Sequence, residues 1–288
     1  MTTADTASRR IFAPGRAGRK TIGAAGHHLC MLLIFVFVMF PIFWISISAF
    51  KRPVDVTKPT VFFPPTLENF RILFSDIFNF GDLIVNSLIV CIAVVMITLP
   101  LAVSGAHALS RFEIPGKPVL LAALLAAQFF PPVVMVLPYF NIFRILGLLD
   151  TYAAIIIVNL TRTVPFAMWL LYGFIDTLPD EIEQAALVDG CGEFGILRLI
   201  TIPLAMPGVI TAAVFSFLLA WNEFLYALLL TSSKTRTVIV GLVNVVGERD
   251  VPWERMSAAG IIVMVPMLIV AYAIRRHFVG GMTMGAVK

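Results

Sequence analysis

Residues 83–110 read LIVNSLIVCIAVVMITLPLAVSGAHALS, a stretch that contains no Asp, Glu, Lys or Arg. A helix needs about 20 predominantly apolar residues to cross the roughly 30 Å of hydrocarbon in a bilayer. The stretch exceeds that length, and its apolar residues are continuous, whereas the strands of a membrane barrel alternate polar and apolar residues. It therefore predicts a membrane-spanning helix.

Comparable apolar runs recur along the chain, and charged residues separate them. One of these runs, residues 151–175, is interrupted only by Arg162. The pattern predicts an all-α membrane protein with six transmembrane helices. We expect the spans near residues 29–50, 83–109, 119–143, 151–175, 205–230 and 256–276.

The composition supports this fold class and excludes others. Of the 288 residues, 59% are hydrophobic and 13% are charged, whereas soluble domains carry about 25% charged residues. The net charge of +4 is modest and is not gathered into one basic face, so nucleic-acid binding is not expected. The three cysteines and four histidines show no metal-ligand spacing, so we predict neither a metal site nor a disulfide framework.

The two termini are expected on the cytoplasmic side of the membrane. An even number of spans places both ends on one side, and the basic cluster in the first 26 residues favours a cytoplasmic N-terminus. The first apolar run is also longer than the apolar part of a cleaved signal peptide. We expect a basic tail over residues 1–26, a transmembrane domain over 27–280 and a C-terminal tail over 281–288.

The polar segment between the fourth and fifth expected spans has a pattern of its own. Residues 176–203 read DTLPDEIEQAALVDGCGEFGILRLITIP. Pro179 starts a short helix with an acidic first turn, and Gly190 breaks it before a second apolar patch. The pattern predicts two short helices that meet at a glycine turn and project from the membrane as a knob. On pattern alone, an amphipathic loop lying at the membrane interface is an alternative.

The spacing in this segment resembles the cytoplasmic EAA loop of ABC importer permeases, which reads E-A-A, three residues, G, nine residues, I, one residue, L-P. Here Gln184 replaces the Glu and Ile202 replaces the Leu, while Glu183 lies next to Gln184. The resemblance implies a coupling loop over residues 177–203 that contacts an ATPase. The coupling residues it implies are Glu183, Gln184, Ala185, Ala186, Asp189 and Gly190.

Other segments narrow the resemblance to the binding-protein-dependent sugar permeases of the MalG-like type, which have a MetI-like bundle. The segments that carry it are residues 62–70, 108–117, 147–152, 220–224 and 281–288.

The resemblance implies a permease subunit of an ABC importer for a sugar or sugar-like solute in the bacterial inner membrane, working by alternating access. It implies four kinds of partner: a second permease subunit, two ATPase subunits, an extracytoplasmic solute-binding protein and membrane lipid. The sequence contains no G-x-x-x-x-G-K-[ST] motif. We therefore expect no cofactor and no enzymatic activity in this chain, with ATP and magnesium bound by the partner ATPase.

Polar residues inside the expected spans are candidates for the solute path. An ionisable residue in a span is costly and is a functional hypothesis by default. Arg162 and Glu223 form a structural ion pair under one interpretation; under the other they line the solute path together with Trp221 and Asn222. In the second case Arg162 suits an anionic sugar such as a sugar acid, sulfonate or phosphate.

Two alternatives to an importer subunit stay open at this point. An ion-coupled secondary transporter could also use Arg162 and Glu223, but such folds often show internal repeats and we find none here. The second alternative is a membrane scaffold that uses the 177–203 loop only for assembly.

Overall fold

The computed structural model describes residues 16–246 and 251–283, and in these residues the regular secondary structure is entirely helical. Four helices are long and apolar enough to cross a membrane. They are α1 (Arg16–Ser48), α4 (Phe80–Arg111), α7 (Tyr152–Ile175) and α14 (Trp253–Thr283).

Two further spans are bent. The segment Lys117–Phe129, which holds α5 (Lys117–Ala126) and η1 (Ala127–Phe129), meets α6 (Pro132–Ile145) at 91°. The segment Glu193–Leu204 meets α11 (Met206–Trp221) at 81°. Counting each bent pair as one span gives up to six, in agreement with the predicted fold class.

The prediction located these spans near residues 119–143 and 205–230 and did not include the bends. Pro131 has an extended backbone (ψ 125°), because the residue before a proline is driven out of the helical region and Pro132 lacks the N–H a continuous helix would need. Within the expected span 205–230, the helix α11 ends at Trp221, and a separate helix, α12 (Leu225–Leu230), follows.

The expected tails fall only partly on described residues. α1 begins at Arg16, within the expected tail 1–26, and α14 runs to Thr283, within the expected tail 281–288. The remainder of both tails lies outside the described residues.

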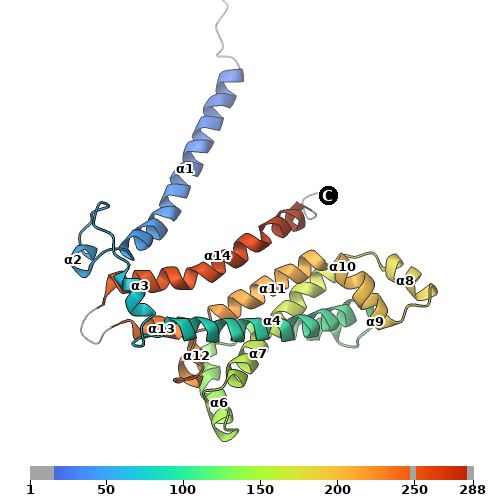
Figure 1. Ribbon diagram of the computed structural model, residues 1–288. Helices are drawn as coiled ribbons and strands as arrows, with labels where there is room; N and C mark the ends of the chain where they lie inside the picture. The colour runs from blue at the N-terminus through green and yellow to red at the C-terminus, as the bar shows by residue number, and fades with distance from the viewer. Residues whose placement is uncertain (1–15, 247–250, 284–288) are drawn as a thin grey trace, which may run out of the picture.

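Short helices gather at the two ends of the bundle. At one end of α4 lie α2, α3 and α13, and at the other end lie α8, α9 and α10 (Figure 1). Their bounds are α2 (Pro53–Val56), α3 (Glu68–Leu73), α8 (Asp180–Val188), α9 (Glu193–Ile196), η2 (Leu197–Thr201), α10 (Ile202–Leu204) and α13 (Val238–Asn244).

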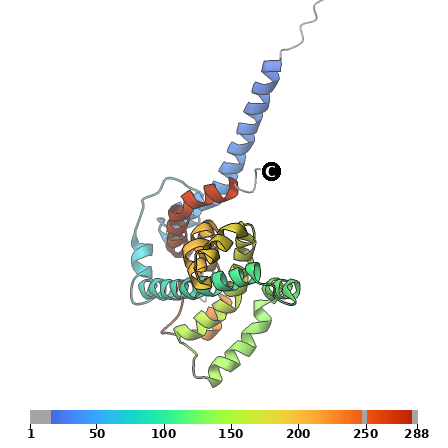
Figure 2. The ribbon, with the colours of Figure 1, turned by 90° about the vertical axis from the view of Figure 1, so that its right-hand side faces the viewer.

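The core is the crossing of α4, α7 and α11 (Figure 2). The hydroxyl oxygens of Thr98 on α4 and Thr163 on α7 lie 2.8 Å apart, and neither residue is exposed. Gly208 on α11 lies so close to Phe174 on α7 that an added Cβ would be 2.6 Å from the ring. Small and hydroxyl-bearing residues therefore let these helices approach closely, as is typical of membrane bundles.

The helix α1 leaves the bundle instead of joining it. Every residue from His27 to Phe43 is exposed, and only the C-terminal end of α1 lies beside α14 (Figure 1). This leaves an apolar helix surface that no described part of the chain covers.

The close contact at Gly208 yields a stability prediction. Gly208→Ala should push α11 away from α7 and destabilise the protein by about 1–3 kcal/mol, the usual cost of overpacking. The matched control is Gly173→Ala on α7, where an added Cβ meets nothing within 4 Å. Thermal unfolding in detergent should show a lower midpoint for the first variant and no loss for the second. Equal midpoints would contradict the packing at Gly208.

Candidate coupling site and solute path

The helix α8 is defined by signals at both ends. Pro179 precedes it in an extended conformation, and Asp180, Glu181 and Glu183 occupy its first turn, where the helix dipole favours negative charge. At its end Gly190 takes a left-handed φ of 87°. A side chain there would strain the backbone, so the glycine fixes where the helix stops.

Backbone hydrogen bonds complete this end of α8. The N–H of Gly190 donates to the carbonyl of Leu187 at 3.0 Å, and the N–H of Cys191 donates to the carbonyl of Ala186 at 2.9 Å. This pair of bonds is a Schellman motif, which satisfies the last carbonyls of a helix. The chain then reverses into α9, so the predicted pair of short helices around a glycine turn is present in the structure (Figure 1).

The Glu183 carboxylate is buried and joins three elements. Arg111, at the end of α4, donates from Nε to Glu183 Oε2 at 2.6 Å. Thr201, in η2, donates from Oγ1 to Glu183 Oε1 at 2.7 Å. The side chains of Arg111 and Glu183 are only 12% and 9% exposed, so losing one member would leave a poorly solvated charge.

Arg111 also holds the segment that leads into α8. Its Nη1 donates to Asp180 Oδ1 at 2.8 Å, and its Nη2 donates to the carbonyl of Leu178 at 3.2 Å. Next to it, the hydroxyl of Ser110 donates to Asp176 Oδ1 at 3.2 Å. The knob formed by α8 and α9 is therefore attached firmly to the end of α4.

The structure separates the expected coupling residues into supporting and outward-facing groups. Glu183 and Ala186 are buried, whereas Gln184, Ala185, Asp189 and Gly190 are exposed. Glu183, not Gln184, carries the ion pair. Sequence reasoning missed Arg111 and Thr201 as its partners. The available signal was the position of Arg111, the first charged residue after the 83–110 run.

The knob exposes several large apolar side chains in addition to its acidic ones. Val188 and Phe194 are 89% and 74% exposed, and Leu199 on η2 is exposed as well. Large apolar side chains exposed on a projecting segment indicate an interaction surface.

Glu223 in the expected solute path has a local structural role. Its carboxylate accepts hydrogen bonds from the N–H of Tyr226 at 3.1 Å and of Ala227 at 2.9 Å, which are among the first free donors of α12. Trp221 is buried and its ring stacks on Phe217 at 5.7 Å between centroids.

Asn222 is exposed and donates from Nδ2 to the carbonyl of Leu218 at 2.8 Å.

Arg162 does not form the ion pair with Glu223 that one interpretation of the sequence expected. Within the described residues, no carboxylate lies within 4.0 Å of its guanidinium. Its side chain is half-buried on α7, and its carbonyl accepts from Gln128 Nε2 at 3.1 Å. The neighbouring Thr161 contacts the hydroxyl of Tyr139 at 3.4 Å. The structure thus shows no direct ion pair between Arg162 and Glu223.

At the end opposite the knob, Asp150 holds the loop that follows α12. Its carboxylate accepts from the N–H groups of Ser232 (2.9 Å), Lys234 (3.3 Å) and Thr235 (3.2 Å), and from the Thr235 hydroxyl (3.0 Å). Burial alone would raise the pKa of Asp150. The four hydrogen bonds outweigh it, and the pKa lies below its usual value.

The comparisons with known proteins agree with this geometry. Residues 84–284 match the family described as "Binding-protein-dependent transport system inner membrane component". The chain belongs to this family. It is therefore a multi-pass transport subunit of the inner membrane and not an enzyme. The ion-coupled alternative has no support.

Relatives of this permease are similar over nearly their whole length. It is 35% identical to "Inner membrane ABC transporter permease protein YcjP" of Escherichia coli over 94% of this chain and 98% of that protein. It is 34% identical to "Sulfoquinovosyl glycerol transport system permease protein SmoH" of Agrobacterium fabrum, covering 87% and 89%. It is 31% identical to "Trehalose/maltose transport system permease protein MalG" of Thermococcus litoralis, covering 89% and 94%. The resemblance to MalG-like sugar permeases is thereby confirmed.

Solved structures share the fold of this permease. A chain of a bacterial ABC transporter that imports the acidic polysaccharide alginate superposes with a TM-score of 0.75 at 22% identity, covering 92% of this chain and 99% of that chain. A chain of a bacterial alginate transporter in complex with a periplasmic protein gives 0.66 at 17% identity, covering 90% and 96%.

The buried ion pair at the knob yields a second prediction. Glu183→Ala should destabilise the protein by about 3 kcal/mol, because Arg111 is left without its buried partner. Glu181→Ala, an exposed residue of the same helical turn, is the control and should have little effect. Differential scanning fluorimetry of the purified protein measures both. Equal midpoints for the two variants would show that the network does not hold the knob.

The depressed pKa of Asp150 yields a third prediction. Because the folded state binds the proton more weakly than the unfolded state, the contribution of Asp150 to stability is present above the ordinary pKa. It is lost as the pH falls through the lower, folded pKa. Asp150→Asn should therefore lower the unfolding midpoint by a constant amount above about pH 5, and this difference should narrow below about pH 4. A difference that does not change with pH would contradict the charged carboxylate as the acceptor.

Proposed function

We propose that this permease is one of two membrane subunits of an ABC importer for a sugar or sugar-like solute. Two partner ATPases dock on the knob of α8 and α9 and bind the ATP and magnesium. A solute-binding protein delivers the solute on the other side of the membrane. The observation that carries the proposal is the Glu183–Arg111–Thr201 network, which fixes the exposed knob to a long central helix.

The central helix offers a mechanical route from the ATPases to the solute path. α4 has 32 residues, which corresponds to a length of about 48 Å at 1.5 Å per residue. It carries the knob at one end through Arg111, and it packs against α7 and α11 along its length. Movement of the knob when the ATPases close on ATP would therefore shift α4 and its neighbours together, which is the mechanical requirement of alternating access.

The exposed helix α1 supports a second permease subunit. Its apolar residues from Leu29 to Phe43 face away from the rest of the chain. Helices in a membrane associate through close packing against one another. Over these residues α1 makes no such packing with the described part of the chain. We place the second subunit against this surface.

The proposed docking of the ATPases on the knob also implies how the bundle is oriented in the membrane. ATPases are cytoplasmic, so the knob end of the bundle faces the cytoplasm and the end with α2, α3 and α13 faces outward. α14 begins at the outer end and runs toward the knob end (Figure 1), which agrees with a cytoplasmic C-terminus. The basic N-terminal region favours the same side for the N-terminus.

The solute class rests on relatives and on Arg162. Relatives at 31–34% identity are named as permeases for trehalose, for trehalose and maltose, and for sulfoquinovosyl glycerol. Arg162 is half-buried in a span without an ion-pair partner among the described residues. A guanidinium in this setting favours an anionic sugar, since it can bind a carboxylate, sulfonate or phosphate with two parallel hydrogen bonds.

A copurification experiment tests the docking of the ATPases. Val188→Asp places a charge on the most exposed apolar residue of the knob and should remove the ATPase from the detergent-extracted complex. The matched control is Val54→Asp on α2, which makes the same change at an exposed residue near the opposite end. It should retain the ATPase.

The outcomes separate clearly. Loss of the ATPase from the knob variant alone supports docking at α8 and α9. Retention by both variants means that docking lies elsewhere, and failure of the wild type to hold an ATPase contradicts the importer assignment itself.

A further inference from the structure

The helix α1 joins the bundle only at its C-terminal end (Figures 1 and 2). Every residue from His27 to Phe43 is exposed, so packing against the described part of the chain does not set the direction of α1. The 22 residues from His27 to Ser48 are about 33 Å long at 1.5 Å per residue, and a rotation of about 10° at the base moves the far end by about 6 Å. The direction of α1 therefore depends on the residues just after Ser48.

The three carbonyls that follow α1 all accept hydrogen bonds from the segment that leads into α3. The Nδ2 of Asn69, on α3, donates to the carbonyl of Ala49 at 2.8 Å and to that of Lys51 at 2.9 Å. The N–H of Thr66 donates to the carbonyl of Phe50 at 2.8 Å. Carbonyls at the end of a helix have no partner within the helix, and here another part of the chain supplies the donors. These five residues form the elbow of α1.

The side chain of Lys51 ties the last turn of α1 to the loop after it. The residue is fully buried, and its Nζ donates to the carbonyl of Lys58 at 3.0 Å. The Nζ also lies 4.6 Å from the centre of the Trp44 ring on α1 and 5.3 Å from that of the Phe63 ring. A buried charge is costly unless its surroundings replace water, and ring faces within about 6 Å attract a cation. Because both rings must stay in place around the ammonium, α1 and the loop hold a fixed angle.

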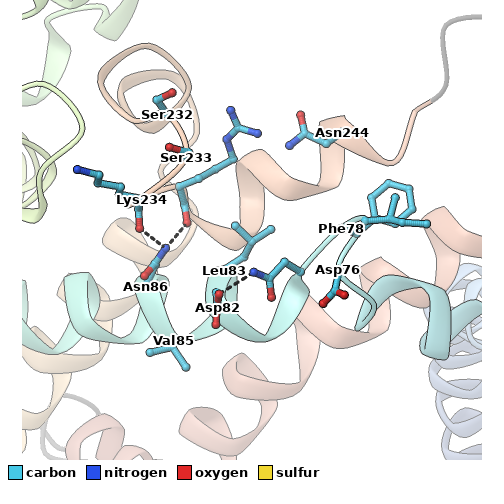
Figure 3. Close-up of a pocket in the computed structure, with 13 residues that line it drawn as sticks. Asp76, Phe78, Asp82, Leu83, Val85, Asn86, Ser232, Ser233, Lys234 and Asn244 are labelled. Atoms are coloured by element: carbon cyan, nitrogen blue, oxygen red, sulfur yellow. Dashed lines mark hydrogen bonds between the residues drawn. The ribbon is translucent and has the colours of Figure 1, made fainter.

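The elbow is itself attached to the rigid part of the bundle. Leu73 on α3 is fully buried, and the ring of Phe70 lies 5.2 Å from that of Phe50 between centroids. In the turn that joins α3 to α4, shown in Figure 3, Asn79 adopts a left-handed φ of 49° and donates from Nδ2 to Asp82 Oδ2 at 2.6 Å. The direction of α1 is thus fixed relative to α4, although α1 packs against little of the bundle.

We infer that the elbow fixes α1 in the direction in which it binds the second permease subunit, and that Lys51 and Asn69 are positioning residues for this assembly. The inference rests on the proposed function, which places that subunit against α1. A helix that swings freely loses orientational freedom when the subunits meet, whereas a fixed helix has lost it already. The elbow therefore raises the affinity without adding a contact. Lys51 and Asn69 are buried and lie outside the exposed surface of α1, so they act through its direction.

The test measures association of the two permease subunits in liposomes that also contain the partner ATPases. Energy transfer between a label on each subunit is followed as the second subunit is added. Lys51→Met removes the ammonium, and Asn69→Leu removes both amide donors at similar side-chain size. Each should raise the amount of second subunit needed for half-maximal association by about tenfold or more, since the lost ordering must be supplied at assembly. Uptake at saturating second subunit should equal that of the wild type.

The matched control is Lys58→Met, the same substitution in the same loop. The Lys58 side chain is 60% exposed and pairs with Asp55 at 3.3 Å, while Lys51 uses only its main-chain carbonyl. This variant should shift the half-maximal point by less than about twofold, because an exposed ion pair contributes little.

The outcomes distinguish direction from folding and from the proposed function. A positioning role moves the half-maximal point and leaves the plateau unchanged, because added second subunit completes the assembly by mass action. If one variant fails to fold, the other decides. An unchanged half-maximal point overturns the inference, and so does a plateau below the wild-type level in both variants, since a chain that fails to fold is not recovered by adding a partner. A wild-type chain that associates with no second subunit contradicts the proposed function instead.

Discussion

The buried ion pair between Glu183 and Arg111 is the interaction on which the rest of the arrangement depends. Its two residues belong to the knob and to the end of the central helix, and Thr201 adds η2 to the same cluster. A charge pair with so little exposure is costly to form, and removing only one of its two partners costs still more. The knob therefore cannot move without either displacing α4 or exposing an uncompensated charge.

The same helix organises the opposite end. Asn86 and Ser87, near its start, hold the loop after α12 through the carbonyls of Lys234 and Arg236 and the N–H of Val238. Between the two ends, the hydroxyl contact of Thr98 joins α4 to α7 inside the core. The helix α4 thus holds the knob at one end and the loop after α12 at the other. Its close packing against the neighbouring spans fixes its position relative to them.

The sequence predicted the parts of this arrangement that depend on local pattern. Uncharged runs marked the spans, and the order Pro179, Ala185–Ala186, Gly190 marked the knob. Pairing between distant residues left no such pattern, so the Arg111–Glu183 contact, across 72 positions, was not foreseen. Glu223 illustrates a different limit. A carboxylate inside a span suggests chemistry, but here the helix ends at Trp221 and the carboxylate satisfies the free N–H groups of the next helix.

The proposed docking of an ATPase subunit on the knob also fits the time for which such a subunit must stay bound. The knob presents apolar side chains such as Val188 and Phe194, and apolar contacts suit a subunit that remains bound, since permanent interfaces are the more hydrophobic ones.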